Sequence, residues 1–224
     1  MTLHSHEAAD ASSRHGNSRA AIGFTVQSGW TSAVLITGTT ASPRVADSRR
    51  IDLSDPTVPE CRQPYHAGFG TARGAGADLS RLVGAVERFG GQSVRDLIHH
   101  HRAAGYQLRG AGAVVGSLID PERIANSHIR IHALEGKLFR GVVEEATARS
   151  RLPCSIWRER DLYASAAAIL GRPEPALRLM LKAMGREVAG SWRGEEKAAA
   201  LAAWLVLARR APAARPRRRR APTA

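Results

Sequence analysis

The spacing of hydrophobic and polar residues divides the first quarter of the chain into short segments. Residues 21–26 and 31–38 are apolar runs rich in Val, Ile, Phe and Thr, and Gly29 between them suits a tight turn. Residues 43–53 form a third such segment after a second turn. Short runs of this composition, bounded by Gly and Pro, are typical of β-strands. The pattern predicts an antiparallel meander of three strands.

The rest of the chain alternates between helical and strand-like spacing. Glycine-containing or β-branched apolar runs predict two further strands, at 108–118 and 153–163. Apolar residues recur at helical spacing in five segments, the first with a potential break at Gly90 and Gly91. The predicted helices cover residues 79–98, 124–146, 162–171, 174–184 and 194–210. Because parallel strands need crossover helices, this order predicts a mixed α/β sheet.

Three remaining segments lack a clear period. Residues 1–20 are polar and residues 209–224 are rich in Pro and Arg, and we expect both to be disordered. Residues 54–77 are first Pro-rich and then Gly/Ala-rich, which predicts either a functional loop or a partly helical insert. The prediction is therefore a single domain over 21–208 with two disordered ends.

The net charge of the whole chain overstates how basic the predicted domain is. The chain of 224 residues carries a formal charge of +13, but seven of its arginines lie in the last sixteen residues, which leaves +6 for residues 1–208. Hydrophobic residues make up 43% and aromatic residues 5%, so aliphatic packing must dominate the core. The domain is mildly basic, and the arginine-rich end would bind polyanions with little sequence preference.

Cysteine usage and hydropathy restrict the cellular setting. The two cysteines form neither a CxxC pair nor a disulfide framework. The first twenty residues lack the order of a secretion signal, and the apolar run at 198–208 is too short to span a bilayer. We expect a cytoplasmic protein with no membrane association.

With this order of strands and helices established, the chain resembles the RuvC-type Holliday-junction resolvase branch of the ribonuclease H-like superfamily. The resemblance covers residues 21–208 and rests on the order of four stretches. They are IGFTVQSGWTSAVLI (22–36), AVVGSLIDPERIANSHIRIHALEGKLFRGVV (113–143), PCSIWRERDLYASAAAILGRPEPALRLMLKAM (153–184) and EEKAAALAAWLVLA (195–208). The resemblance implies a ribonuclease H-like sheet whose first three strands form an antiparallel meander.

The chain departs from this family where the family's nucleases hold two divalent ions. There the resemblance implies carboxylates on the first strand, at the end of the fourth and on the last helix, because hard cations need that negative charge. The first strand here ends in Gln27 and Ser28 without an acid. We therefore expect no metal cofactor, and we take Gln27 and Ser28 as candidate ligand contacts. A divergent nuclease using Mg²⁺ or Mn²⁺ is the alternative, with Asp120, Glu135 and Glu196 as its catalytic residues.

Histidines on the helix over 124–146 raise a second question. His128, His132 and Glu135 lie four and three residues apart and so share a helical face. This spacing suits a solvated face with charge pairing, a functional polar face, or a metal site. The first interpretation is the simplest, and His132 is retained as a candidate binding residue. The His run at 99–101 is interpreted as helix surface.

The loop after the third strand supplies a further set of candidates. Arg62, Gln63, Tyr65 and His66 are close together between prolines. An arginine there could hold a phosphate or carboxylate, and His66 could transfer a proton. Arg62, Tyr65 and His66 are the candidate binding residues in this loop. Arg217, Arg218, Arg219 and Arg220 at the C-terminal end are candidates for nonspecific polyanion contact.

These observations leave three functional hypotheses. The leading one is a nucleic-acid-binding or accessory protein of ribonuclease H-like fold without the two-metal carboxylate set. The second is the divergent metal-dependent nuclease. The third is a structural protein, such as a homodimer, with no nucleic-acid role.

Overall fold

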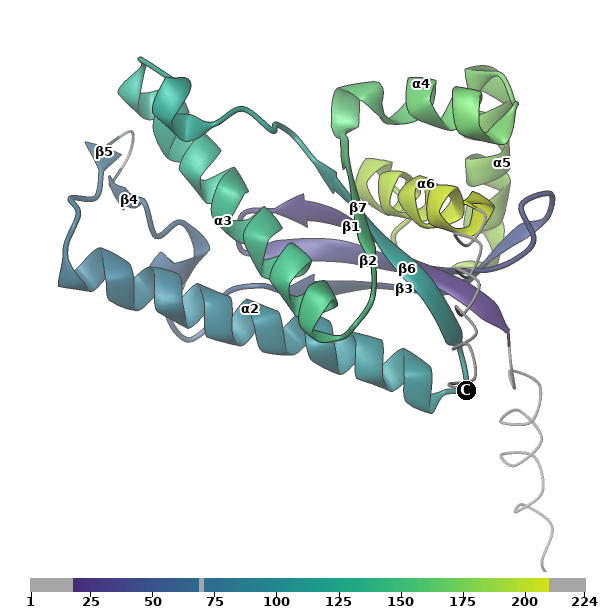
Figure 1. Ribbon diagram of the computed structural model, residues 1–224, viewed down its shortest axis with the longest axis horizontal. Helices are drawn as coiled ribbons and strands as arrows, with labels where there is room; N and C mark the ends of the chain where they lie inside the picture. Colours follow the sequence, from purple (N-terminus) through teal and green to yellow (C-terminus); the bar gives the residue numbers. More distant parts are fainter. Residues whose placement is uncertain (1–17, 69–70, 210–224) are drawn as a thin grey trace, which may run out of the picture.

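Five strands form one mixed sheet in the order β3-β2-β1-β6-β7 (Figure 1). They are β1 (Arg19–Gln27), β2 (Trp30–Gly38), β3 (Pro43–Asp52), β6 (Gln107–Val115) and β7 (Cys154–Arg158). The first three pair antiparallel, and β6 and β7 extend the sheet from β1 in parallel. The computed structural model describes residues 18–68 and 71–209. The strand order and connections confirm the predicted ribonuclease H-like fold.

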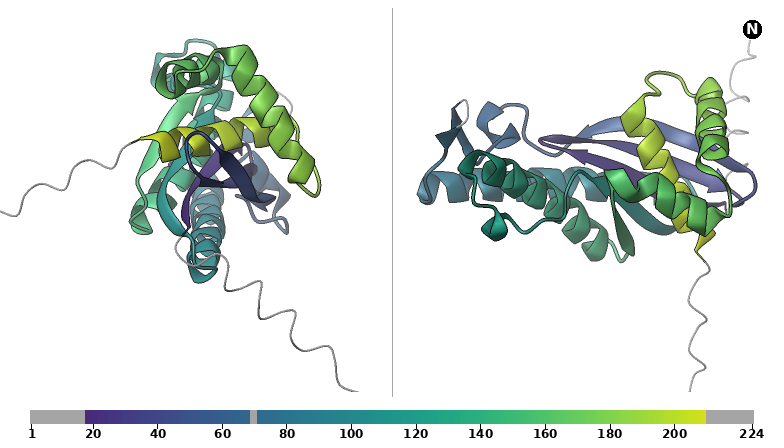
Figure 2. Two further views of the ribbon diagram at one scale, coloured as in Figure 1. Left: turned by 90° about the vertical axis from the view of Figure 1, so that its right-hand side faces the viewer. Right: turned by 90° about the horizontal axis from the view of Figure 1, so that it is seen from above.

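Helices cover both faces of this sheet (Figures 1 and 2). Those with two or more turns are α2 (Ala77–Ala103), α3 (Ser127–Arg149), α4 (Glu159–Leu170), α5 (Glu174–Met184) and α6 (Gly194–Ala208). α2 and α3 pack on one face, while α6 packs on the other beneath α4 and α5. The short elements are η2 (Pro59–Arg62), β4 (His66–Gly68), β5 (Thr71–Ala72), η3 (Pro121–Arg123) and η4 (Gly185–Glu187).

The first strand is buried on both faces, which explains its continuous apolar pattern. Ile22 and Phe24 pack against α2 and α3, and Ala21 packs against α6. Gly23 faces α6 so closely that a Cβ atom built there would lie 1.7 Å from the Ala199 carbonyl oxygen. A central strand flanked by helices on both sides needs this alternation of large side chains with small ones.

Two predicted boundaries are wrong, for identifiable reasons. α2 runs without a break through Gly90 and Gly91. The glycine at position 90 is needed for close packing instead, because a Cβ there would lie 2.5 Å from the carbonyl oxygen of Leu53, directly after β3. The strand predicted over 153–163 ends at Arg158, and Glu159 begins α4. Acidic residues in the first turn of α4 interact favourably with the helix dipole.

The structure also refines the ends of the domain. β1 begins at Arg19, two residues before the predicted domain start, and α6 ends at Ala208. Residues 1–17 and 210–224, where most of the predicted disorder falls, lie outside the described residues. Among the described helices, none is long and apolar enough to cross a membrane.

Candidate functional site

One buried carboxylate ties the loop after β3 to α3. Glu135 Oε1 accepts a hydrogen bond from the Tyr65 backbone N–H at 2.9 Å and lies 3.2 Å from His66 Nδ1. The Glu135 side chain is 1% exposed, and its Oε2 has no hydrogen-bond partner among the described residues. The interpretation of this helical face as fully solvated is therefore wrong at Glu135, because the loop folds over it.

Burial changes the acid–base behaviour of this carboxyl group. Desolvation raises the pKa of Glu135 to about 7, although the hydrogen bond from Tyr65 opposes the rise. The carboxyl group of Glu135 can therefore gain or lose a proton near neutral pH. The sequence alone marked Glu135 as a candidate but gave no sign of its burial.

Three imidazole rings lie together at this end of α3. His128 and His132, both exposed, place their Nε2 atoms 3.2 Å apart, and the His66 and His132 ring centroids are 5.1 Å apart. Partial desolvation, followed by the neighbouring His128 and His66, lowers the pKa of His132. Burial and the neighbouring rings thus favour the neutral form of His132.

These rings border a surface cavity of about 750 Å³, which we call the histidine pocket. Its lining residues are Pro59, Glu60, Arg62, Gln63, His66, Ala67, Gly68, Arg73, His128 and His132. The predicted residues Arg62, His66 and His132 thus share one cavity. Arg73 was not predicted, and its guanidinium is held by Asp78 at 2.7 Å and by the Pro64 and His66 carbonyl oxygens.

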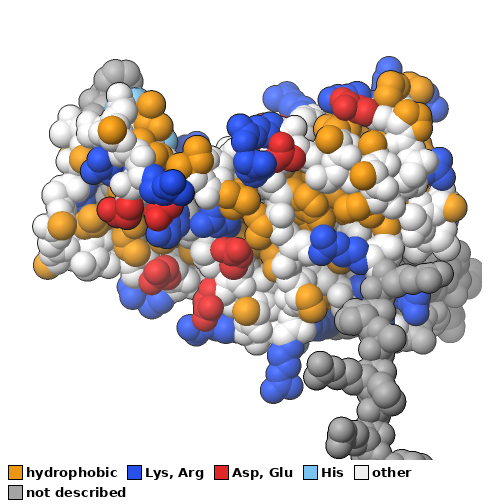
Figure 3. All heavy atoms as spheres, turned by 45° about the horizontal axis from the view of Figure 1, so that its top comes forward, with side chains coloured by type: hydrophobic (Ala, Val, Ile, Leu, Met, Phe, Trp, Pro, Cys, Tyr) orange, Lys and Arg blue, Asp and Glu red, His pale blue; other side chains and the backbone are white. Residues whose placement is uncertain are grey.

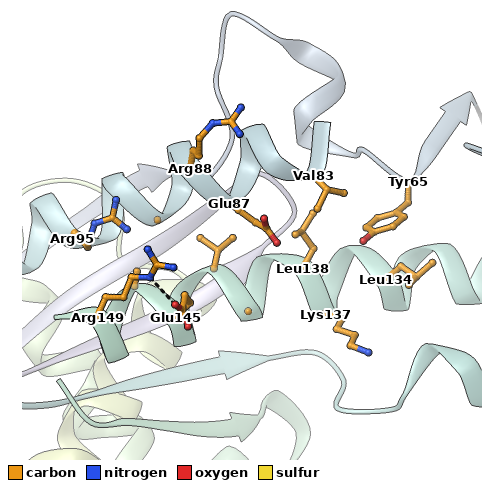
Figure 4. Close-up of a pocket in the computed structure, with 14 residues that line it drawn as sticks. Tyr65, Val83, Glu87, Arg88, Arg95, Leu134, Lys137, Leu138, Glu145 and Arg149 are labelled. Atoms are coloured by element: carbon orange, nitrogen blue, oxygen red, sulfur yellow. Dashed lines mark hydrogen bonds and ion pairs between the residues drawn. The ribbon is translucent and has the colours of Figure 1, made fainter. Parts of the chain in front are cut away.

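Tyr65 lies instead at a second cavity of about 770 Å³ between α2 and α3, the α2–α3 groove (Figure 4). Its apolar lining comprises Val83, Leu134, Leu138, Val142 and Ala146, and its charged lining comprises Glu87, Arg88, Arg95, Lys137, Glu145 and Arg149. In Figure 4 Arg95 and Arg149 lie toward one end of the groove and Tyr65 toward the other. Burial, and then the charges of Glu135 and Glu87, raise the pKa of the Tyr65 hydroxyl, so it stays protonated.

Four arginines of α2 recur at a regular spacing, which the pattern of apolar residues alone does not reveal. Arg81, Arg88, Arg95 and Arg102 recur every seven residues along α2 and so lie on one side of that helix. We call these four the arginine row. Arg88 and Arg95 line the groove.

The edge where β1 and β6 end differs from a two-metal nuclease site. Thr25 Oγ1 donates a hydrogen bond to the Glu195 carbonyl oxygen at 2.8 Å, and Ser32 Oγ donates one to Glu196 Oε1 at 3.3 Å. The Arg193 backbone N–H donates to Glu196 Oε2 at 2.7 Å, so this carboxylate caps the first turn of α6. Both oxygens of Glu196 thus have protein partners.

The other two predicted catalytic residues have separate partners. Asp120 caps η3 and lies 3.9 Å from Lys137 Nζ, while Glu135 binds the loop at Tyr65 and His66. Within residues 18–68 and 71–209, no group of three or more His, Cys, Asp or Glu side chains could hold a metal ion. Asp120, Glu135 and Glu196 therefore do not form a common metal centre. These three carboxylates do not fit the two-ion chemistry of the nucleases that the sequence resembles.

The remaining candidates lie at a turn and at the C-terminal end. Gln27 ends β1, and Ser28 follows in the turn to β2. The Gly29 carbonyl oxygen there accepts hydrogen bonds from the Leu53 and Ser54 backbone N–H groups, so the turn is fixed next to the loop that carries Arg62. Arg217, Arg218, Arg219 and Arg220 lie outside the described residues.

Comparisons with known proteins found similar structures but no sequence family. No protein family and no curated protein matched the chain. Thermus thermophilus RuvC in complex with a Holliday junction substrate is 14% identical, with 84% of this chain and 91% of that chain covered and a TM-score of 0.48. The Thermus thermophilus RuvC structure gives the same identity and score, with 92% of its chain covered.

A third similar structure is the Aquifex aeolicus member of the Ppx/GppA protein family. It is 12% identical, with 68% of this chain and 39% of that chain covered and a TM-score of 0.34. The assignment of the fold rests on the strand order and connections of the chain itself.

Proposed function

We propose that this protein is a nucleic-acid-binding domain of ribonuclease H-like fold that acts as an accessory factor rather than as a two-metal nuclease. The observation that carries the proposal is the arginine row of α2, two of whose members, Arg88 and Arg95, line the α2–α3 groove. A row of guanidinium groups on one side of a long helix provides repeated contacts for a phosphate backbone.

The dimensions of α2 suit a backbone contact. At a rise of about 1.5 Å per residue, a seven-residue repeat separates successive arginines by about 10 Å, so the row extends over about 30 Å. Lys137 adds positive charge from α3 on the facing side of the groove, where Arg149 is paired with Glu145 at 2.6 Å, and Glu87 is the other acidic lining residue. Figure 3 shows basic side chains interspersed with acidic and hydrophobic ones over the face that carries α3 and α4.

The apolar lining of the groove and the Tyr65 ring provide a surface for bases and sugars, which the arginine row does not. Aromatic rings and aliphatic side chains can contact bases or sugars of a single strand, while arginines hold its phosphates. The Tyr65 ring at the end of the groove provides such a surface. These features favour binding through backbone and stacking contacts with little sequence preference.

The proposal is tested by fluorescence anisotropy with junction, duplex and single-stranded DNA. We expect the paired change Arg88→Ala and Arg95→Ala to weaken binding by about tenfold or more at low salt. Each phosphate contact that is lost means that fewer counterions are released from the DNA on binding, which lowers the affinity. The matched control is Arg160→Ala with Arg186→Ala, which removes the same charge from α4 and η4.

Two results would contradict the proposal. One is an absence of binding at low salt, where phosphate contacts are strongest. The other is an equal loss of affinity in the groove pair and in the control pair, which would show that only net charge matters.

A further inference from the structure

The histidine pocket brings together ionisable groups that DNA binding in the α2–α3 groove does not use. We propose that it is a phosphate-binding site that takes up protons when it binds, with His128 and His132 as the pH-dependent donors and Arg62 as the permanent cation. The chemical class of the ligand is a phosphate group, carried either by a nucleic-acid end or by a small phosphorylated molecule.

The geometry of the two α3 histidines supports this assignment. Their Nε2 atoms lie 3.2 Å apart, so in the free protein one ring donates its N–H to the other and both point to the same place. A phosphate oxygen that replaces this contact, with the two rings turned apart, would accept an N–H from each ring at about 2.8 Å once both Nε2 atoms carry a proton. Hydrogen bonds between imidazolium and a phosphate oxygen are charge-assisted and short.

The charges around the pocket also suit an anion. From η2, Arg62 and Glu60 line it, and Glu60 is the one carboxylate among its lining residues. From the segment that leads into α2, Arg73 lines it with its charge paired to Asp78. No aspartate lines the pocket, so the basic groups outnumber the acidic one.

The inner wall of the pocket is fixed by the contact between His66 and Glu135. His66 comes from β4 and has its Nδ1 against the buried Glu135 carboxyl of α3, so it lies at a defined position beside His132. A carboxyl partner on one ring nitrogen fixes the orientation of the imidazole. The pocket is thereby partly organised before a ligand arrives.

Binding and protonation are coupled in a defined direction. In the free protein, partial burial and then the neighbouring His128 and His66 lower the pKa of His132, so its neutral form is favoured. A phosphate group between the rings reverses this, because its negative charge favours the imidazolium forms. Affinity should therefore rise as pH falls, by up to about tenfold per pH unit for each proton taken up.

Sulfate is the first probe, because it has the shape of phosphate and a constant charge near neutral pH. We expect isothermal titration of the full chain to show about tenfold or more tighter sulfate binding at about pH 6 than at about pH 8. Changing His128→Asn and His132→Asn together should remove this pH dependence, and Arg62→Ala should weaken binding at both pH values. The matched control is His99→Asn with His100→Asn on exposed positions of α2.

Equal pH dependence in the His128/His132 variant and in the wild type would overturn the proposal. A second measurement in the wild-type protein guards against misfolding of the variant. NMR of ¹⁵N-labelled histidine should show both rings becoming protonated when sulfate is added at constant pH. Unchanged ring signals would equally overturn it.

Oligonucleotides with and without a 5′-phosphate identify the source of the phosphate group. Tighter binding of the 5′-phosphorylated strand at low pH, lost in the His128/His132 variant, shows that a nucleic-acid end is the ligand. Sulfate binding without this preference excludes a 5′-phosphorylated nucleic-acid end as the ligand and favours a small phosphorylated molecule. The site stands independently of the groove, because changing Arg88 and Arg95 should leave the sulfate result unchanged.

Discussion

At the scale of single residues, Glu135 shows how burial converts an ordinary carboxylate into a pH-sensitive contact. It accepts the Tyr65 N–H and pairs with His66 while almost completely hidden from solvent. Its pKa is raised from 4.5 to about 7. A carboxyl whose pKa is higher in the folded than in the unfolded state makes the fold less stable as pH rises from about 4.5 to about 7.

This linkage predicts the effect of Glu135→Gln. Glutamine keeps an oxygen that can accept the Tyr65 N–H but cannot ionise, so the cost of a buried charge disappears. We expect the free energy of unfolding at about pH 8 to exceed that of the wild type by about 2–3 kcal/mol, with little difference at about pH 4.5. Urea unfolding measures it, and Glu87→Gln at an exposed position is the control. Lower stability of Glu135→Gln at pH 8 would contradict it.

His101 has the opposite dependence, and the interpretation of the 99–101 run as helix surface is wrong for this residue. It is 3% exposed and lies 3.5 Å from Asp47 Oδ2, because the end of α2 packs against β3. Burial lowers the pKa of His101 to about 4, although Asp47 opposes the shift. The folded state therefore binds the proton less readily than the unfolded chain does.

Stability carried by neutral His101 should be lost as pH falls from about 6.5 toward about 4. His101→Leu removes the titrating group, so we expect its free energy of unfolding to decline less steeply over this range than that of the wild type. Thermal unfolding at a series of pH values gives the comparison, with His100→Leu as the control. Parallel pH profiles for His101→Leu and the wild type would show that folding does not lower the pKa of His101 and would contradict the prediction.

At the scale of elements, the contact between β1 and α6 depends on the absence of a side chain. Gly23 faces the backbone of α6 at Ala199, where a helix with alanines on its buried side approaches the sheet. Such close approach requires glycine in the strand and small residues on the helix.

Gly23→Ala should therefore destabilise the protein by about 3 kcal/mol or more, because backbone rather than a flexible side chain blocks the new methyl group. The control is Gly136→Ala in α3, where a Cβ meets no atom within 4 Å. That change should stabilise the protein by about 0.5–1 kcal/mol through higher helix propensity. Chemical unfolding of both variants tests the contrast, and a Gly23→Ala protein of wild-type stability would refute the close packing.

At the scale of the whole molecule, positive charge is divided between the folded domain and the C-terminal end. Residues 210–224 contain six arginines and no acid, whereas the arginine row lies on α2. The two should contribute separately to nucleic-acid binding, because counterion release adds over phosphate contacts.

A chain that ends at Arg209 should bind duplex DNA more weakly and with a smaller salt dependence than the full chain, yet keep measurable binding. Adding Arg88→Ala and Arg95→Ala to it should lower the slope of log K against log salt by a further ~1.5–2. Anisotropy titrations at several salt concentrations provide these slopes. Loss of all binding on truncation would assign the affinity to the C-terminal end alone.

The sequence by itself determined the order of the main strands and helices and thus the fold, because burial on both faces leaves continuous apolar runs in β1 and β6, and burial on one face leaves a helical period in α3. It also marked Arg62, His66, His132 and Glu135 as separate candidates. Only the tertiary structure decided that Glu135 is buried, that His66 meets it across 69 positions of sequence, and that Glu196 caps a helix. Such pairings arise when a loop without period folds onto a distant helix, and side-chain spacing within one element cannot encode that contact.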